Sequence, residues 1–340
     1  MLRAPTLPIR PCPIPLLRAR DIPHPDRAVA RGEVVAVRRG VYAPAAAWGE
    51  LAPWDRYLVR VHAASAVRPG LTFSHESAAV LLGLPVVGDP FWVHVVGDAF
   101  TTAGARSGLV VHSSAVPRET IDGGDCAVTS ATECAVDIAR SRHEVVGLSL
   151  ADAVLRADAG LSVEILVARN EDRGSSRGRR LARWALHRAS ALAESTFESA
   201  SRAVIEWLGY PAPELQQVFG DPRVGIDRSD FWWPGQRVAG EADGDLKYDG
   251  RFGDATVLLR ERRRRDARIR SRGARQVAHW GWSDMLMHQP LDDLLFAAGL
   301  RHVERVDTAR LVGARRALTA SPAPSPAPSA RQQFGAETAG

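Results

Sequence analysis

The 340-residue sequence contains almost no lysine. Lys247 is the only lysine among 44 lysine and arginine residues, a bias that we attribute to codon usage. It lies in the segment 241–249, beside four carboxylates. An ammonium group is a compact charge with an adjustable pKa, whereas a guanidinium is planar and permanently charged. Lys247 is therefore a candidate for chemistry that arginine cannot perform.

Cysteine and long apolar runs are also scarce. Cys12, Cys126 and Cys134 are too few for a disulfide framework or a cysteine-based zinc site, and their scarcity fits a reducing cytoplasm. The longest apolar stretch, residues 78–96, is interrupted by two prolines, Asp89 and a histidine, so it cannot span a membrane. We therefore expect a cytoplasmic protein without a membrane segment.

The remaining composition is that of an ordinary globular protein, with 45% hydrophobic and 24% charged residues. The length suits two or three domains, and a net charge of +5 suits a polyanionic partner. The predicted fold class is mixed α/β. The predicted parts are a flexible proline-rich leader (1–18), a winged-helix-like DNA-binding domain (19–72), a mixed α/β middle region (73–190), an endonuclease-like domain (191–312) and a disordered Pro/Ser/Ala tail (313–340).

The amino-terminal pattern predicts a helix followed by a tight basic hairpin. A short helix is expected over 26–31, with strands at 33–37 and 40–42 around Arg38 and Arg39. This order is the outline of a winged helix, in which these two arginines would contact phosphate or the minor groove of DNA. The alternative is that both arginines are merely exposed in a turn.

The middle region alternates between helical and strand-like segments, and the run 173–180 is expected to be a loop at a domain boundary. The run Ser74-His75-Glu76 has the residue types of a catalytic triad, but neighbouring residues on a helix point in different directions, so we interpret it as the capping start of a helix. The ten histidines show no ligand spacing, so core or surface roles are expected for them. The predicted helices cover 54–66, 74–83, 130–140, 149–157 and 163–169, and the predicted strands cover 91–96 and 109–112.

The carboxyl-terminal third predicts helices packed on a small mixed sheet. Trp232, Trp233, Trp280 and Trp282 are expected to fill its core. The expected order is a helix at 195–208, strands at 215–219, 224–232 and 237–242, a basic helix at 256–272, a strand at 276–280 and a final helix from 283.

Acidic residues gather in this third. A turn at 234–236 folds Asp230 toward the next strand, on which Glu241 and Asp243 share one face, and Glu198 approaches from the preceding helix. Such carboxylates raise each other's pKa unless a cation lies among them, and Mg²⁺ prefers oxygen ligands. We expect Asp230, Glu241 and Asp243 to bind Mg²⁺, with Lys247 assisting catalysis. The alternative is a solvated loop in which Asp243-Gly244 makes a turn.

The basic helix carries a surplus of positive charge. Between residues 260 and 272, eight arginines face two acids. Pairs between residues four apart could neutralise part of this charge on a solvated face. The surplus nevertheless favours a surface that binds the nucleic-acid backbone. Its candidate residues are Arg262, Arg264, Arg265 and Arg268.

Over residues 195–280 the sequence resembles the very-short-patch-repair-type endonuclease domain of the restriction-endonuclease-like, PD-(D/E)xK, superfamily. The resemblance implies a metal-dependent endodeoxyribonuclease with Glu198 as the helix acid, Asp230 as the central aspartate and Glu241 as the second acid. Asp243 stands where that pattern has lysine, so either Lys247 has taken over its role or the cleavage centre is incomplete. The matching segments are 195–199, 213–216, 230–231, 240–244, 247–248 and 262–266, with Trp280.

The amino-terminal third is similar to AbiEi-type antitoxins of type IV toxin–antitoxin systems. The similarity lies in 38–42, 74–79 and 83–85. It implies a winged helix that binds operator DNA, and a cognate toxin as a possible partner. The sequence thus predicts a DNA-associated protein with a Mg²⁺-dependent endonuclease domain, or alternatively a non-catalytic antitoxin that represses its own promoter. It leaves the oligomeric state open.

Overall fold

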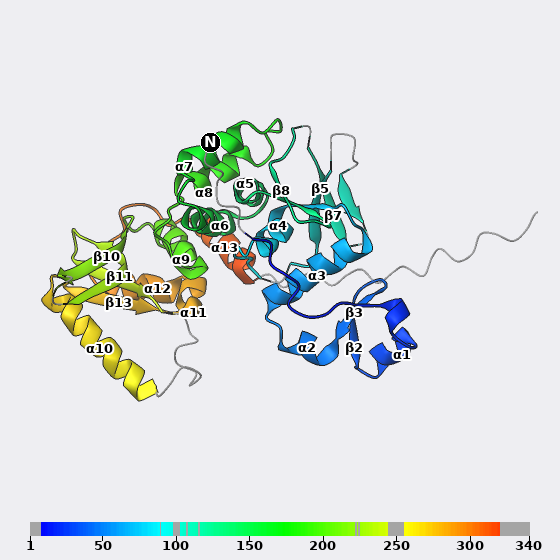
Figure 1. The fold of residues 1–340 in the computed structure, drawn as a ribbon. Helices are drawn as coiled ribbons and strands as arrows, with labels where there is room; N and C mark the ends of the chain where they lie inside the picture. The colour runs from blue at the N-terminus through cyan, green and yellow to red at the C-terminus, as the bar shows by residue number, and fades with distance from the viewer. Residues whose placement is uncertain are drawn as a thin grey trace, which may run out of the picture.

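The structure is a computed structural model that describes residues 8–88, 90–97, 103–106, 108–114, 116–221, 223, 225–243 and 255–319. It is a mixed α/β protein with three sheets, which confirms the predicted class at that level (Figure 1). Among these residues, no helix combines the length and apolar character needed to cross a membrane.

The first sheet is a small antiparallel one with strand order β1-β3-β2. The predicted hairpin is present, since β2 and β3 pair on either side of a turn in which Gly40 has a φ of +77°. Val41 and Ala43 point from β3 into the core. The elements are β1 (Leu17–Arg18), a 3-10 helix (Ala19–Asp21), α1 (Pro25–Ala30), β2 (Val34–Arg38), β3 (Val41–Pro44), α2 (Ala45–Glu50) and α3 (Pro53–Val67).

The predicted flexible leader is wrong for residues 8–18. The backbone N–H of Arg10 donates to the Leu81 carbonyl at 2.7 Å, and its side chain pairs with Asp55 at 3.0 Å. Leu17–Arg18 then forms β1 beside β3. Backbone pairing holds this segment in place despite its prolines; residues 1–7 lie outside the described part.

The second sheet is mixed and has the strand order β6-β7-β5-β4-β9-β8. Pairs β5–β7 and β4–β9 are parallel, so helices or long loops must connect them. The strands are β4 (Thr72–Phe73), β5 (Val93–Gly97), β6 (Gly104–Arg106), β7 (Leu109–Ser113), β8 (Thr120–Asp122) and β9 (Ala127–Thr129). The helices are α4 (His75–Leu81), α5 (Ala131–Ser141), α6 (Glu144–Ala157), α7 (Val163–Glu171) and α8 (Arg179–His187).

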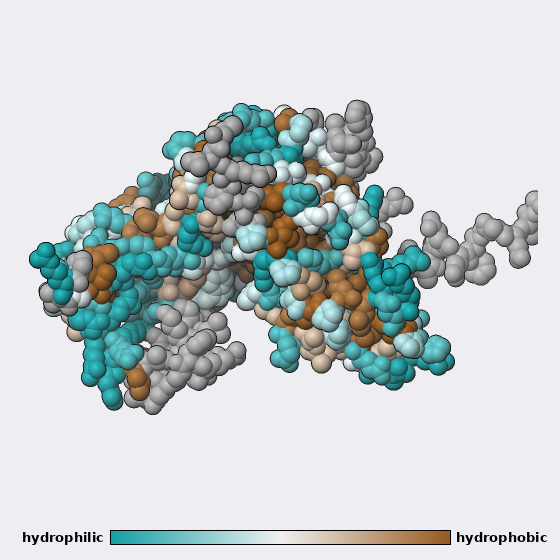
Figure 2. Space-filling model, viewed as in Figure 1, coloured by the Kyte–Doolittle hydropathy of each residue, from teal (hydrophilic) through white to brown (hydrophobic). Residues whose placement is uncertain are grey.

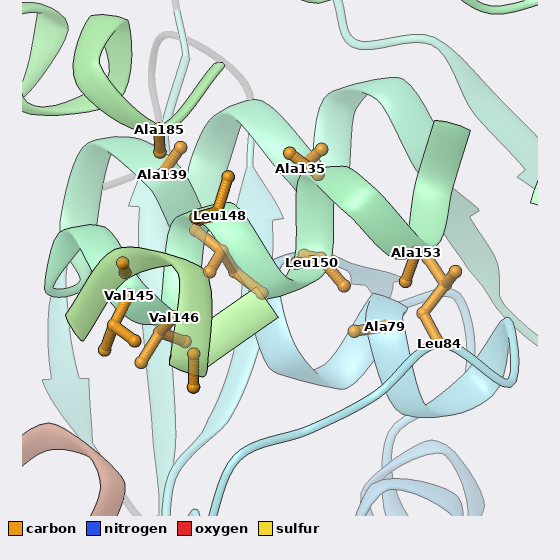
Figure 3. Packing of buried hydrophobic residues seen from close by; sticks show 14 of the residues in the cluster. Ala79, Leu84, Ala135, Ala139, Val145, Val146, Leu148, Leu150, Ala153 and Ala185 are labelled. Atoms are coloured by element: carbon orange, nitrogen blue, oxygen red, sulfur yellow. The ribbon is translucent and has the colours of Figure 1, made fainter. Parts of the chain in front are cut away.

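Small residues let α5, α6 and α8 approach closely. A Cβ on Gly147 would lie 2.9 Å from the Cα of Ala139. Figure 3 shows Ala139 and Ala185 directed toward one another, with Leu148 and Leu150 filling the space below. Close packing of this kind makes even one added methyl group costly. α6 begins at Glu144, five residues before the predicted start, because the His143 ring accepts a hydrogen bond from Val145 N and caps it.

The segment 173–180 is not a linker. Arg173 is buried and pairs with Asp137 at 3.0 Å. A Cβ on Gly178 would lie 2.0 Å from the Arg140 carbonyl oxygen, so this backbone rests directly on α5. The run of Gly, Ser and Arg predicts a loop correctly for residues 173–178, whereas Arg179 and Arg180 already belong to α8. Buried ion pairs bind this loop to the rest of the middle region.

The third sheet has the order β10-β11-β12-β13, with the first three strands antiparallel and β13 parallel to β12. Trp233 and Trp280 are buried in its core, as expected, whereas Trp232 and Trp282 are only half-buried. The elements are α9 (Thr196–Trp207), β10 (Glu214–Asp221), β11 (Gly225–Trp233), β12 (Val238–Ala242), α10 (Ala255–Ser271), β13 (Gln276–Trp280), α11 (Trp282–Met287), α12 (Gln289–Ala297) and α13 (Thr308–Thr319).

α13 corrects the predicted start of the tail. It runs to Thr319, past residue 313, because Leu311, Ala314 and Leu318 are buried. Figure 1 places α13 beside α6 and α9, between the second and third sheets. Residues 320–340 lie outside the described part.

Candidate functional site

The predicted acidic residues meet on the third sheet. Phe231 of β11 lies opposite Gly240 of β12, and continuing this register by one residue places Asp230 opposite Glu241. Asp230 Oδ2 accepts a hydrogen bond from the Ala242 N–H at 2.9 Å. Glu241 is only 3% exposed. Antiparallel pairing therefore brings two carboxyl groups together on one face of the sheet, as the sequence predicts.

Burial and mutual repulsion disfavour charge on this pair. Burial raises the pKa of Glu241 to about 8, and the neighbouring Asp230 adds to the shift. Burial likewise raises the pKa of Asp230 to about 6, and the negative charge of Glu198 contributes. At neutral pH the two groups therefore share a proton unless a cation compensates them.

Glu198 is fixed by the start of α9. Its carboxylate accepts hydrogen bonds from Ser195 Oγ, Glu194 N and Gln216 Nε2, all between 2.8 and 2.9 Å. Ser195 Oγ in turn accepts a hydrogen bond from the Glu198 N–H, which caps α9. These hydrogen bonds fix the Glu198 side chain, and its negative charge contributes to the raised pKa of Asp230.

Asp243 is held from the neighbouring strand and helix. His279 Nδ1 lies 2.8 Å from the Asp243 carboxylate, and its Nε2 lies 3.0 Å from Asp266 of α10. Arg262 approaches Asp243 at 3.5 Å. Lys247, the predicted catalytic lysine, lies outside the described residues.

The acids offer two facing carboxylates rather than a closed cage. Among the described residues, no three acidic side chains bring ligand oxygens within 4.8 Å of one another. Mg²⁺ is commonly held by one or two carboxylates together with water and substrate oxygens. Asp230 and Glu241 fit that requirement, since an ion between them would also remove their repulsion.

Arginines of α10 are divided between internal pairs and the surface. Arg265 binds Glu241 at 2.9 Å, and Arg268 makes two hydrogen bonds of 2.7 and 2.9 Å to Asp227. Arg264 is exposed. In Figure 2 the end of the molecule where α10 lies is strongly hydrophilic. Of the four predicted phosphate-binding arginines, Arg262, Arg265 and Arg268 also contact acids of the sheet.

The two hairpin arginines differ in exposure. Arg39 is exposed at the turn between β2 and β3. Arg38 is half-buried, and burial lowers its pKa. A Cβ on Gly108 would lie 3.8 Å from an Arg38 side-chain nitrogen, so Arg38 packs near the β6–β7 turn. Arg39 is therefore the more accessible of the two.

A cluster of three histidines on the second sheet was missed by the sequence interpretation. His75 begins α4, His94 lies on β5 and His112 lies on β7 (Figure 1). His94 Nδ1 and His112 Nε2 are 2.9 Å apart, and the rings of His75 and His112 stack with centroids at 3.9 Å. Burial lowers the pKa of all three, that of His112 to about 4.

The expected side-chain cap at Ser74 is absent, because Ser74 Oγ contacts the His75 ring at 3.0 Å instead. Parallel pairing of β5 with β7 brings residues 94 and 112 together, and no local spacing encodes that pairing. Scattered histidines therefore gave no signal of a cluster.

A cavity of about 850 Å³ opens beside this cluster. His75 and His112 form part of its wall. The charged residues that line it are four arginines and one aspartate, so its field favours anions. These residues are Arg118, Arg140, Arg173, Arg177 and Asp137.

Comparison with known proteins adds little about activity. A 134-residue segment, 39% of this chain, is 37% identical to uncharacterized proteins from two strains of Mycobacterium tuberculosis, CDC 1551/Oshkosh and ATCC 25618/H37Rv. The matched segment covers 49% of each relative, so the similarity extends over only about half of their length. No family model and no solved structure matches the chain.

Proposed function

We propose that the protein is a DNA-associated, Mg²⁺-dependent endonuclease whose centre is formed by Asp230 and Glu241. The observation that carries this proposal is the carboxyl pair of half-buried Asp230 on β11 and buried Glu241 on β12, for which Arg265 at 2.9 Å from Glu241 is the one cation paired in the described part of the chain. The order helix, three antiparallel strands, helix and parallel strand supports it, since that order agrees with the endonuclease-like arrangement expected from the sequence.

Each described residue of the centre has a separate task in this proposal. Asp230 and Glu241 would hold Mg²⁺, which would supply an activated water and neutralise charge on the scissile phosphate. Glu198 is held by its hydrogen bonds from Ser195, Glu194 and Gln216, and it increases the negative field at Asp230. Asp243 and His279 form a hydrogen-bonded pair that can hold a proton near the metal ligands. Lys247 is proposed to stabilise developing negative charge.

Basic residues at two places would hold the DNA. The exposed arginines of α10, such as Arg264, lie on the helix that packs against the acidic strands. They would contact the phosphate backbone without reading sequence. Arg39 on the amino-terminal hairpin offers a second contact.

The proposal is tested by incubating purified full-length protein with plasmid, linear duplex, single-stranded DNA and RNA in Mg²⁺ or Mn²⁺. We expect cleavage of DNA that falls by at least about 100-fold in Asp230→Ala and Glu241→Ala. Glu214→Ala is the matched control, because Glu214 is an exposed acid on the same sheet. Absence of cleavage by the wild type on every substrate would overturn the nuclease proposal.

A second candidate is a non-catalytic, antitoxin-type repressor that binds its own promoter. It is favoured by the pairing of Glu241 with Arg265 at 2.9 Å and of Asp243 with His279 at 2.8 Å, because a domain that only binds would keep its acids neutralised internally. This candidate predicts promoter binding that survives Asp230→Ala, weakens in Arg39→Ala, and is accompanied by a cognate toxin in pull-down experiments.

A further inference from the structure

We propose that His75, His94 and His112 bind one zinc-class divalent ion, whose open coordination position faces the arginine-lined cavity and accepts an anionic ligand. The site is separate from the acidic centre: it is built on the second sheet, from α4, β5 and β7, whereas Asp230 and Glu241 lie on the third. It does not depend on nuclease activity.

The spacing of the ligand nitrogens fits this ion. One ring nitrogen from each histidine lies within 4.8 Å of the other two, and His94 Nδ1 is 2.9 Å from His112 Nε2. Tetrahedral Zn²⁺ at about 2.0–2.1 Å from each nitrogen needs separations of about 3.3 Å. Small side-chain rotations would satisfy this geometry. Imidazole ligands suit Zn²⁺, Cu²⁺ or Ni²⁺, whereas Mg²⁺ prefers oxygen.

Carboxylates lie behind two of the three rings. Glu76 is 3.6 Å from His94 Nε2, which leaves Nδ1 for the ion. Asp137 is 3.9 Å from His75 Nδ1, and its Oδ2 is buried without a hydrogen-bond partner among the described residues. A carboxylate on the outer nitrogen fixes the ring orientation of a metal-binding histidine and increases its basicity.

The backbone also directs one ring into the cluster. His75 has a φ of +51°, in the left-handed region that few non-glycine residues occupy, although histidine, like asparagine and aspartate, enters it more often than most. Strain of this kind persists only where the surrounding structure enforces it, and it gathers at functional sites. This backbone conformation places the nearly buried His75 ring against the rings of His94 and His112.

The cavity defines the class of the fourth ligand. Three protein ligands leave one position open, which is the arrangement of catalytic rather than structural zinc sites. His75 and His112 reach the wall of the cavity, so that position opens into it. Arg118 and Arg173 are held there by two buried carboxylates, since both lie 3.0 Å from Asp137 and both also pair with Glu133. Because these carboxylates offset two positive charges, the surplus charge that selects a small anion such as a phosphate group comes from Arg140 and Arg177.

The test uses the full-length chain stripped of metal with a chelator and titrated with Zn²⁺ by calorimetry, with Co²⁺ absorption reporting tetrahedral ligation. We expect one ion per chain in the wild type and binding at least about 100-fold weaker in His94→Ala and His112→Ala. His187→Ala is the matched control, since His187 is exposed on α8. Asp230→Ala/Glu241→Ala should bind Zn²⁺ as the wild type does.

Two further measurements show whether lost Zn²⁺ binding reflects a lost ligand rather than an unfolded protein, and whether the bound ion accepts an anion. His112→Cys keeps a ligand atom, so it should retain Zn²⁺ where His112→Ala does not. Inorganic phosphate should bind the zinc-loaded wild type more tightly than the stripped protein. If the stripped wild type takes up no stoichiometric ion, or His94→Ala and His112→Ala bind it unchanged, the site is refuted. Equal phosphate binding with and without Zn²⁺ would refute an open coordination position on the ion that accepts an anion.

Discussion

The acidic centre of the third sheet and the histidine cluster of the second sheet respond to burial in opposite ways. Glu241 loses solvent and its pKa rises to about 8, whereas His112 loses solvent and its pKa falls to about 4. In both places the uncharged form is favoured. Oxygen donors on one sheet and nitrogen donors on the other therefore suit different cations.

The largest expected effect separates these two sites. We expect Asp230→Ala to reduce DNA cleavage by at least about 100-fold while Zn²⁺ binding is unchanged, because the ligands of each ion lie on different sheets. We expect His112→Ala to show the converse result. Parallel measurements of cleavage and Zn²⁺ titration on the same preparations provide the check. A loss of both properties in either variant would mean that the two sites form one functional unit, and the comparison would fail.

A smaller effect concerns stability against pH in the metal-free protein. Glu241 has a pKa of about 8 when folded and about 4.3 when unfolded, so the folded state retains the proton between these values. The free energy of unfolding should therefore fall as pH rises through this window. Glu241→Gln removes this loss, and we expect it to be more stable than the wild type near pH 8 by on the order of 2–3 kcal/mol.

The histidine cluster should show the opposite slope. His112 has a folded pKa of about 4 against about 6.5 unfolded, so the unfolded state binds the extra proton and stability falls as pH drops from about 6.5 to 4. His112→Asn should reduce this loss of unfolding free energy at acidic pH by about 1 kcal/mol, a value lowered because His112 is partly exposed. Urea unfolding across pH, with chelator present, measures both slopes. Slopes that are unaltered by the substitutions would contradict the assigned causes.

The contrast between the sites also explains what could be predicted from sequence. Glu241 and Asp243 lie two residues apart on one strand, and Asp230 precedes the turn that leads to it, so local periodicity brings them together. His75, His94 and His112 are separated by 19 and 18 positions and meet only through strand pairing and helix packing. Long-range topology of this kind leaves no local pattern in a single sequence.

For secondary structure and packing as well, features encoded by nearby residues were predicted and features that depend on distant residues were not. The elements around the third sheet were predicted in the right order up to β13, whereas the one helix expected from 283 is three helices, α11, α12 and α13. The packing of segment 173–178 was missed, because Arg173 and Gly178 have the composition of an exposed loop. Only their partners, Asp137 and the Arg140 carbonyl, reveal that they belong to the core. Charged residues that are buried in pairs are the feature that composition identifies least well.

The smallest predicted effect compares the two hairpin arginines. Arg39 is exposed and Arg38 is half-buried near the β6–β7 turn. If the hairpin contacts DNA, Arg39→Ala should weaken binding about threefold and lower the slope of log affinity against log salt by about one, as loss of one phosphate contact does. Arg38→Ala should chiefly lower stability. Fluorescence anisotropy across salt concentrations measures the first, and thermal unfolding the second. An unchanged salt slope in Arg39→Ala would place DNA binding entirely on α10, and the basic helix rather than the hairpin would then be the surface that the acidic centre uses.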